Sequence, residues 1–238
     1  MLEEIETAHG KPVISRILSP KERRSCIFSM GYNPQDGCFH FGYIPENPPT
    51  QVHICHELLH ACLLVAGWPN YYPDVELEKY PLEEAAIHYL KDLAQHIVVW
   101  PMMEKLGYNE VEASTAEALE KAVLAVKRGI LVPGCHPDVH VKIQAAILAH
   151  ILLCPIEEKM KGYIRDEARR TMPQESLLAA KIVHVFEQVQ LFSPKSCQDA
   201  LDGALEIAGW PKECLLAESL RQTYPHFLEH ILEIHRTI

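Results

Sequence analysis

The chain contains one motif whose residue types and spacing could do chemistry, His56-Glu57-Leu58-Leu59-His60. On a helix, residues four apart lie about one turn apart on the same face, so His56 and His60 can direct their imidazoles at one point. Two imidazoles at this spacing can bind one zinc ion. Glu57 lies beside them without being a ligand, and its carboxylate can take a proton from a water that zinc activates for attack on a carbonyl. The motif therefore predicts a metal-dependent hydrolase with Glu57 as general base.

The surroundings of the motif favour this interpretation. The residues that flank it are uncharged, as an apolar helix requires: Ile54, Cys55, Ala61 and Cys62. Short apolar, partly aromatic runs precede the helix. In these features, which cover residues 1–110, the chain resembles the zincin superfamily of HExxH zinc metallopeptidases. The resemblance implies Zn²⁺ as cofactor, a peptide or protein as substrate, and an upstream edge strand that holds the substrate in an extended form.

A catalytic zinc site needs a third protein ligand and one open coordination position. The extended motif of the metzincins would require glycine at position 63 and a ligand at position 66, where this chain has Leu63 and Ala66. That subfamily is excluded. The third ligand is therefore expected from the next helix, as in gluzincin-like arrangements.

Four polar residues follow one another at four-residue steps on that next helix: Glu84, His88, Asp92 and His96. If the two helices run antiparallel, the loop over residues 67–80 places the level of the motif some way into the second helix, which disfavours Glu84 although gluzincins normally use glutamate. We expect His96 to be the third metal ligand. Asp92 is either an alternative ligand or a carboxylate that orients an imidazole. His88 and Glu84 remain alternative ligands. A further alternative is that these four residues bind no metal and only form the solvated face of the helix.

Other polar residues near the motif are weaker candidates. His53 is expected to lie outside the ligand set. Tyr71, Tyr72 and Tyr80 lie in the loop between the two helices, where one of them could donate a hydrogen bond to an oxyanion. The alternative for each tyrosine is a packing role.

Turn formers and helix stops predict an α+β fold that is mainly α. The apolar runs at residues 25–30 and 38–44 flank a segment rich in turn formers, which is typical of a β-hairpin. Thr50 is expected to cap a helix over residues 51–66. Further helices are expected over residues 81–106, 118–127, 137–153, 155–170, 175–192, 196–208 and 213–238. A small N-terminal β-sheet would thus pack on the active-site helix, and a helical C-terminal region would follow.

The division expected from this pattern places a metal-binding catalytic region in residues 1–110 and a helical region in residues 111–238, either in the same domain or in a second one. The helical region is expected to cover the cleft, to bind a protein partner or to mediate a homo-oligomer.

The composition bears on the binding partners and the cellular location of the protein. The 238 residues include 32 acidic and 22 basic ones, and the net charge of −10 argues against nucleic-acid binding. The acidic N-terminus lacks the apolar core of a signal peptide, and no run approaches the length of a membrane span. We therefore expect a cytoplasmic protein that binds no membrane, with most of its eight cysteines as reduced core residues.

Two other classes of function remain compatible with the sequence. One is a non-catalytic or latent zincin-like scaffold that acts as a binding or regulatory protein. The other is a structural helical protein without metal, in which His56 and His60 only form hydrogen bonds.

Overall fold

The computed structural model describes residues 1–20, 22, 28–73, 81–108, 137–188, 193–210 and 215–236. They confirm the expected fold class, since helices dominate and a small sheet lies near the N-terminus. The chain forms two compact units. The first comprises Met1–Asn70, Pro101–Glu110 and Ser219–Ile238, and the second comprises Tyr71–Trp100 and Val111–Glu218. One boundary between the units falls at residue 110, but the first unit also includes residues after 110 and the second unit also includes residues before it. The assignment of a catalytic and a helical region stays a prediction.

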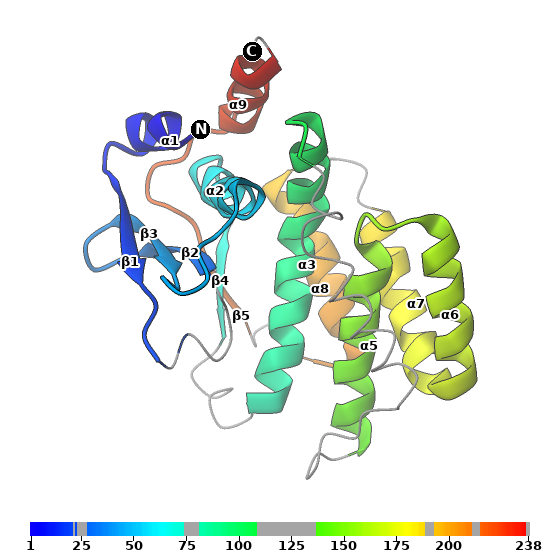
Figure 1. Ribbon diagram of the computed structural model, residues 1–238. Coiled ribbons are helices and arrows are strands. Elements are labelled where there is room, and N and C mark those ends of the chain that lie inside the picture. Colours follow the sequence, from blue (N-terminus) through cyan, green and yellow to red (C-terminus); the bar gives the residue numbers. More distant parts are fainter. Residues whose placement is uncertain are drawn as a thin grey trace. The chain divides into compact units, whose positions relative to one another are not determined.

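The first unit begins with α1 (Leu2–His9), followed by the strands β1 (Val13–Ile17), β2 (Phe28–Asn33) and β3 (Cys38–Tyr43) (Figure 1). The strand order is β1-β3-β2, with β3 parallel to β1 and antiparallel to β2. The predicted hairpin is therefore confirmed, although Gly31–Asn33, expected in the turn, belong to β2. Because β2 lies at the edge of the described sheet, one row of its backbone groups faces away from β3.

Helix α2 (Gln51–Val65) carries the HExxH motif and begins where expected. The hydroxyl of Thr50 accepts from the backbone N–H of His53, and the His53 imidazole accepts from the N–H of Thr50, which forms a capping box. His53 also stacks on Phe28, with ring centroids 4.5 Å apart. Gly67, at φ 102°, ends the helix in a conformation that other residues rarely adopt. His53 is thus occupied in starting α2 and lies outside the ligand set, as expected.

Helix α2 is largely buried and packs against α1, β2 and the C-terminal helix α9 (Phe227–Arg236). The backbone N–H of Tyr224 donates to the carbonyl of Val65 at 2.7 Å, which ties the segment before α9 to the end of α2. The motif therefore lies on a helix held by elements from both ends of the chain.

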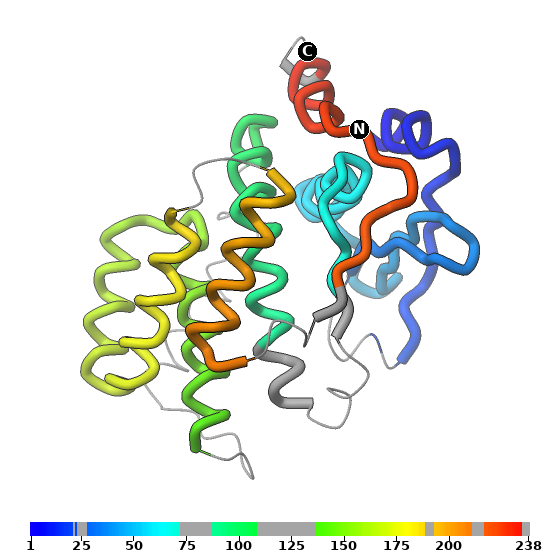
Figure 2. The backbone as a smooth tube through the Cα atoms, turned by 180° about the vertical axis from the view of Figure 1, so that it is seen from behind, coloured from blue at the N-terminus to red at the C-terminus, as the bar shows by residue number. Residues whose placement is uncertain are grey.

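The second unit is a helical bundle formed by the larger part of α3 (Pro81–Lys105) together with α5 (Pro137–Leu153), α6 (Glu158–Thr171), α7 (Pro173–Glu187) and α8 (Pro194–Ala208). Figures 1 and 2 show α5, α6, α7 and α8 side by side, and α7 contacts each of the other three. Their facing sides bury a core of Leu, Ile, Ala and aromatic residues. Helix α3 continues through Pro101, and its last turn belongs to the first unit.

The helix expected over residues 213–238 is wrong. Strand β5 (Leu215–Glu218) pairs with β4 (Asn70–Pro73), and helix begins again only at Phe227. Pairing with β4 keeps Leu215–Glu218 extended, and Pro225 disfavours helical geometry in the residue before it, so the helix does not extend back to residue 213. The helix expected over residues 118–127 lies outside the described residues.

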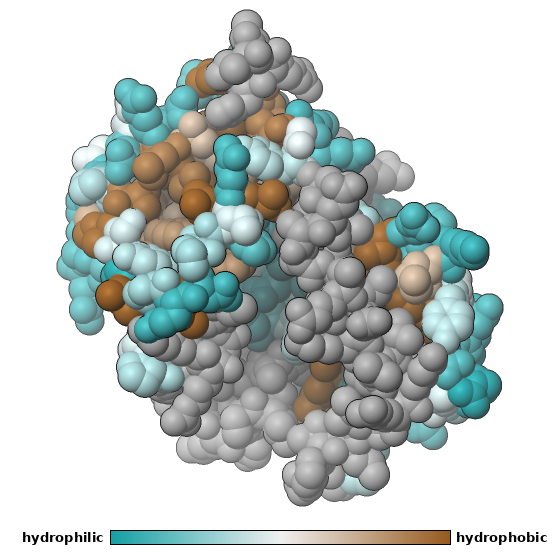
Figure 3. Space-filling model, viewed as in Figure 1, coloured by the Kyte–Doolittle hydropathy of each residue, from teal (hydrophilic) through white to brown (hydrophobic). Residues whose placement is uncertain are grey.

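Apolar side chains also reach the surface. Figure 3 shows apolar atoms gathered over α1 and α2, where Leu2 and Ile54 are exposed. On α6 and α7, Met160, Tyr163 and Leu177 are exposed as well. Among the described residues, no helix combines the length and the apolar character that crossing a membrane requires. A protein partner on the C-terminal helices stays a prediction.

Most described cysteines lie in the core, as predicted, and none of them forms a disulfide. Cys38, Cys55, Cys62 and Cys197 are buried, whereas Cys154 is half-buried. Burial raises the pKa of the Cys62 thiol, which suppresses the reactive thiolate.

This difference in burial predicts the order of thiol labelling. In the native protein at pH 8, iodoacetamide should modify Cys62 at least roughly 10-fold more slowly than Cys154, because a buried thiol must lose its protection before it ionises. Peptide mass spectrometry after timed quenching measures both rates. Equal rates in the native protein would contradict the burial of Cys62; equal rates in denaturant are the control.

The two leucines inside the motif offer a matched test of packing. Leu59 is fully buried and Leu58 only partly so. Leu59→Ala should lower the free energy of unfolding by about 2–5 kcal/mol because it leaves a cavity in the core, and Leu58→Ala should cost clearly less. Denaturant titration of both variants measures the difference. A smaller loss for Leu59→Ala than for Leu58→Ala would contradict the orientation of α2.

Candidate metal centre

The two histidines of the motif face each other one turn apart on α2. Their Nε2 atoms lie 3.0 Å apart, and the ring centroids are separated by 4.9 Å. The side chain of His56 is buried, with 9% of the residue exposed, and His60 is half-buried. As the i,i+4 spacing predicted, the imidazoles of His56 and His60 therefore point toward each other.

The spacing of these two nitrogens fits a shared metal ion. Two nitrogen ligands of a tetrahedral zinc ion lie about 3.3 Å apart when each is about 2.05 Å from the metal. The observed 3.0 Å is close to that value. Only a small opening of the pair is needed to admit the ion.

His96 of α3 is the third residue of the candidate group. One ligand atom from each of His56, His60 and His96 lies within 4.8 Å of the other two, so the three histidines could hold a metal ion. Among the described residues, no other group of three or more His, Cys, Asp or Glu side chains is placed to do so. These are the three residues expected as metal ligands. The identity of the metal belongs to the proposal below.

Among the described side chains of α3, His88 and Asp92 are not part of this group. They contact each other, with Nε2 and Oδ2 3.1 Å apart. The His88 side chain is exposed and that of Asp92 is half-buried. The side chain of Glu84 lies outside the described residues. The orienting role suggested for Asp92 stays a prediction, and Asp92 contacts His88.

Glu57 is held by the edge strand of the sheet. The backbone N–H of Met30 donates to Glu57 Oε2 at 2.6 Å. This N–H points from β2 toward α2, so a carboxylate oxygen satisfies a donor that the sheet leaves open. A hydrogen bond of this kind restricts the position of the carboxylate beside His56. That arrangement suits a general base.

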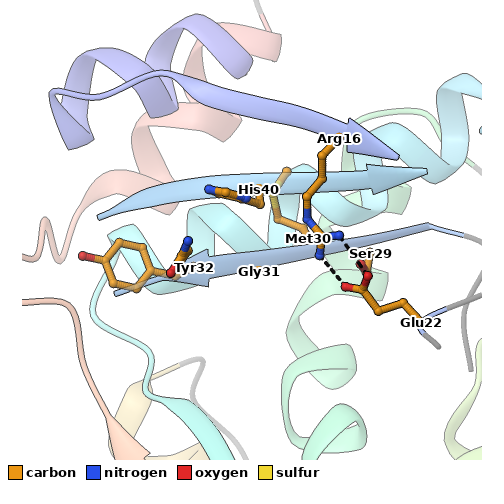
Figure 4. A pocket seen from close by; sticks show the side chains of 8 residues that line it. Arg16, Glu22, Ser29, Met30, Gly31, Tyr32 and His40 are labelled. Carbon is orange, nitrogen blue, oxygen red and sulfur yellow. Dashed lines mark hydrogen bonds and ion pairs between the residues drawn. The ribbon is translucent and has the colours of Figure 1, made fainter. Parts of the chain in front are cut away.

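A polar pocket lies on the sheet beside this contact (Figure 4). Its volume is about 360 Å³, and the lining residues include Arg16, Glu22, Ser29, Met30 and His40. Arg16 forms two hydrogen bonds to Glu22, at 3.0 and 2.5 Å, and these bonds together with those from Ser19 lower the pKa of Glu22 to about 2. Because Arg16 and Glu22 neutralise each other, this pair favours neither an anion nor a cation.

Tyr71 has a packing role. It is 2% exposed and belongs to the apolar core of the second unit. Burial raises the pKa of its hydroxyl, which keeps it protonated. The side chains of Tyr72 and Tyr80 lie outside the described residues.

The structure also brings a residue to the centre that the sequence did not indicate. His150 of α5 lies edge-on to His96, with ring centroids 5.3 Å apart and an interplanar angle of 85°. In the sequence, His150 only interrupts an apolar run, and a single histidine without a spaced partner carries no local signal.

Comparisons of the chain with protein-family models, with curated proteins and with solved structures find no match. The resemblance to zincins rests on the motif and its surroundings.

The bond from Met30 to Glu57 predicts a protected amide on an edge strand. Glu57→Ala should speed hydrogen exchange at the Met30 amide by roughly 10- to 100-fold, because a hydrogen bond to a charged acceptor contributes about 1.5–3 kcal/mol. Glu57→Gln should keep most of the protection, since its carbonyl oxygen can still accept. NMR-detected exchange measures both variants, and the Leu201 amide in α8 reports global opening. Unchanged exchange at Met30 in Glu57→Ala would contradict the contact.

Proposed function

We propose that this chain is a zinc-dependent hydrolase with a zincin-like site, and that its substrate is a peptide or protein. The observation that carries the proposal is the convergence of His56, His60 and His96 within 4.8 Å, with Glu57 next to His56 on the same helix. Three neutral imidazoles form a ligand set that suits zinc and leaves the fourth tetrahedral position open.

Each residue has a defined task in this proposal. The three imidazoles would hold the ion, and Glu57, whose carboxylate is oriented by the Met30 N–H, would accept a proton. Zinc would lower the pKa of a bound water and polarise the substrate carbonyl. Glu57 would then return the proton to the leaving group.

A peptide substrate is supported by the position of β2. An edge strand can add an extended chain through main-chain hydrogen bonds, and β2 lies beside the proposed base. This assignment also follows from the resemblance to zincin peptidases. A third histidine, where gluzincins normally have glutamate, is the departure from that pattern.

Metal analysis tests the ligand set. Protein reconstituted with Zn²⁺ and desalted should retain about one zinc per chain, since three protein ligands make a tight site. His56→Ala, His60→Ala and His96→Ala should each lose it, whereas His184→Ala, which removes an exposed histidine on α7, should retain it. Zinc content is measured by inductively coupled plasma mass spectrometry. Zinc retained in the three ligand variants, or absent from the wild type, would refute the site.

Glu57→Gln tests the base. The variant should keep the metal and lose at least about 100-fold in turnover, since general-base catalysis contributes about 10²–10⁴-fold. Turnover is measured on a peptide library, with cleavage products identified by mass spectrometry. Unchanged turnover in the variant would refute the role of Glu57. A wild type that binds one zinc but cleaves no peptide would contradict the peptidase proposal and favour the non-catalytic scaffold.

A further inference from the structure

His150 lies at the centre of an aromatic cluster in the second unit. Its ring is edge-on to those of His96, Trp100 and Tyr89, with centroids 5.3, 5.7 and 6.0 Å away. The angles between the ring planes are 85°, 87° and 78°. Helix α5 contributes His150, and α3 contributes the other three rings. His150 is thus the residue through which α5 reaches the proposed metal ligand.

The ring of His96 is held from two directions. Trp100, one turn later on the same helix, stacks on its face with centroids 5.1 Å apart and an interplanar angle of 22°. His150 meets the same ring at nearly a right angle. Edge-to-face and offset-stacked contacts are the arrangements that aromatic rings prefer. Two contacts at right angles to each other restrict the ring more than either could alone.

Ring rotation is the variable that matters for a histidine ligand. The torsion between Cβ and the imidazole has a broad minimum, so a histidine without packing partners points its nitrogens in many directions. A metal site needs one nitrogen directed at the ion, and groups that orient the ligand strongly affect the affinity. Trp100 lies on the same helix as His96, whereas His150 lies on α5. The contact with His150 therefore fixes the ring of His96 relative to a neighbouring helix.

We propose that His150 is a positioning residue of the proposed metal centre, which holds the His96 imidazole in one orientation within the second unit. The inference rests on the metal site proposed above. His150 itself is not a member of the group of ligand atoms that lie within 4.8 Å of one another. Its action is therefore through His96 rather than through contact with the ion.

Zinc affinity of the full-length chain tests this role. His150→Ala should weaken Zn²⁺ binding by roughly 10- to 100-fold, the usual effect of removing a group that orients a ligand. His150→Phe should restore affinity to within a few-fold, because a phenyl ring keeps the edge-on contact without offering a nitrogen. His184→Ala is the matched control and should bind as the wild type does. Competition with a chromophoric chelator measures all four proteins. Unchanged affinity in His150→Ala, or an equal loss in His150→Ala and His150→Phe, would overturn the proposal.

A second measurement separates this inference from the proposed function. In metal-free protein labelled with ¹⁵N-histidine, the ring signals of His96 should shift in His150→Ala and stay close to the wild type in His150→Phe, since both effects depend only on ring packing. Unchanged His96 signals in His150→Ala would overturn the positioning role even if zinc binds. If the wild type binds no zinc, the proposed function fails, while the same spectra still decide whether His150 orients His96.

Discussion

The periodicity of α2 is the constraint on which the metal centre depends. Cys55, Leu59 and Cys62 are buried at i, i+4 and i+7, so they form one apolar stripe that fixes the rotation of the helix about its axis. Once that rotation is set, the direction of His56 and His60 is set with it. The 3.0 Å between their Nε2 atoms is therefore a consequence of core packing as much as of the motif.

The contact between Glu57 and Met30 adds a second restraint on the same helix. It joins residues 27 positions apart and satisfies an open donor of the edge strand with a carboxylate. The sheet thus contributes more than a scaffold, because its edge orients the group that the proposed chemistry requires.

Local signals predicted much of the fold. Thr50 was expected to cap a helix, and α2 begins beside it because capping acts within a few residues. The prediction failed where pairing is distant in sequence. β5 is a strand because it pairs with β4, and no spacing within residues 213–238 contains that information.

For the candidate metal centre, too, local spacing was predictable from the sequence and distant contacts were not. The sequence by itself determined that His56, Glu57 and His60 share one helix, because the i,i+4 relation holds on any helix. The sequence favoured His96 as third ligand but left Glu84, His88 and Asp92 as alternatives, because all four lie at four-residue steps on α3. Only the tertiary structure showed that His56, His60 and His96 could hold one metal ion, that Met30 binds Glu57 and that His150 lies against His96. These relations depend on which distant elements pack together, and the spacing of residues within one helix does not specify that choice.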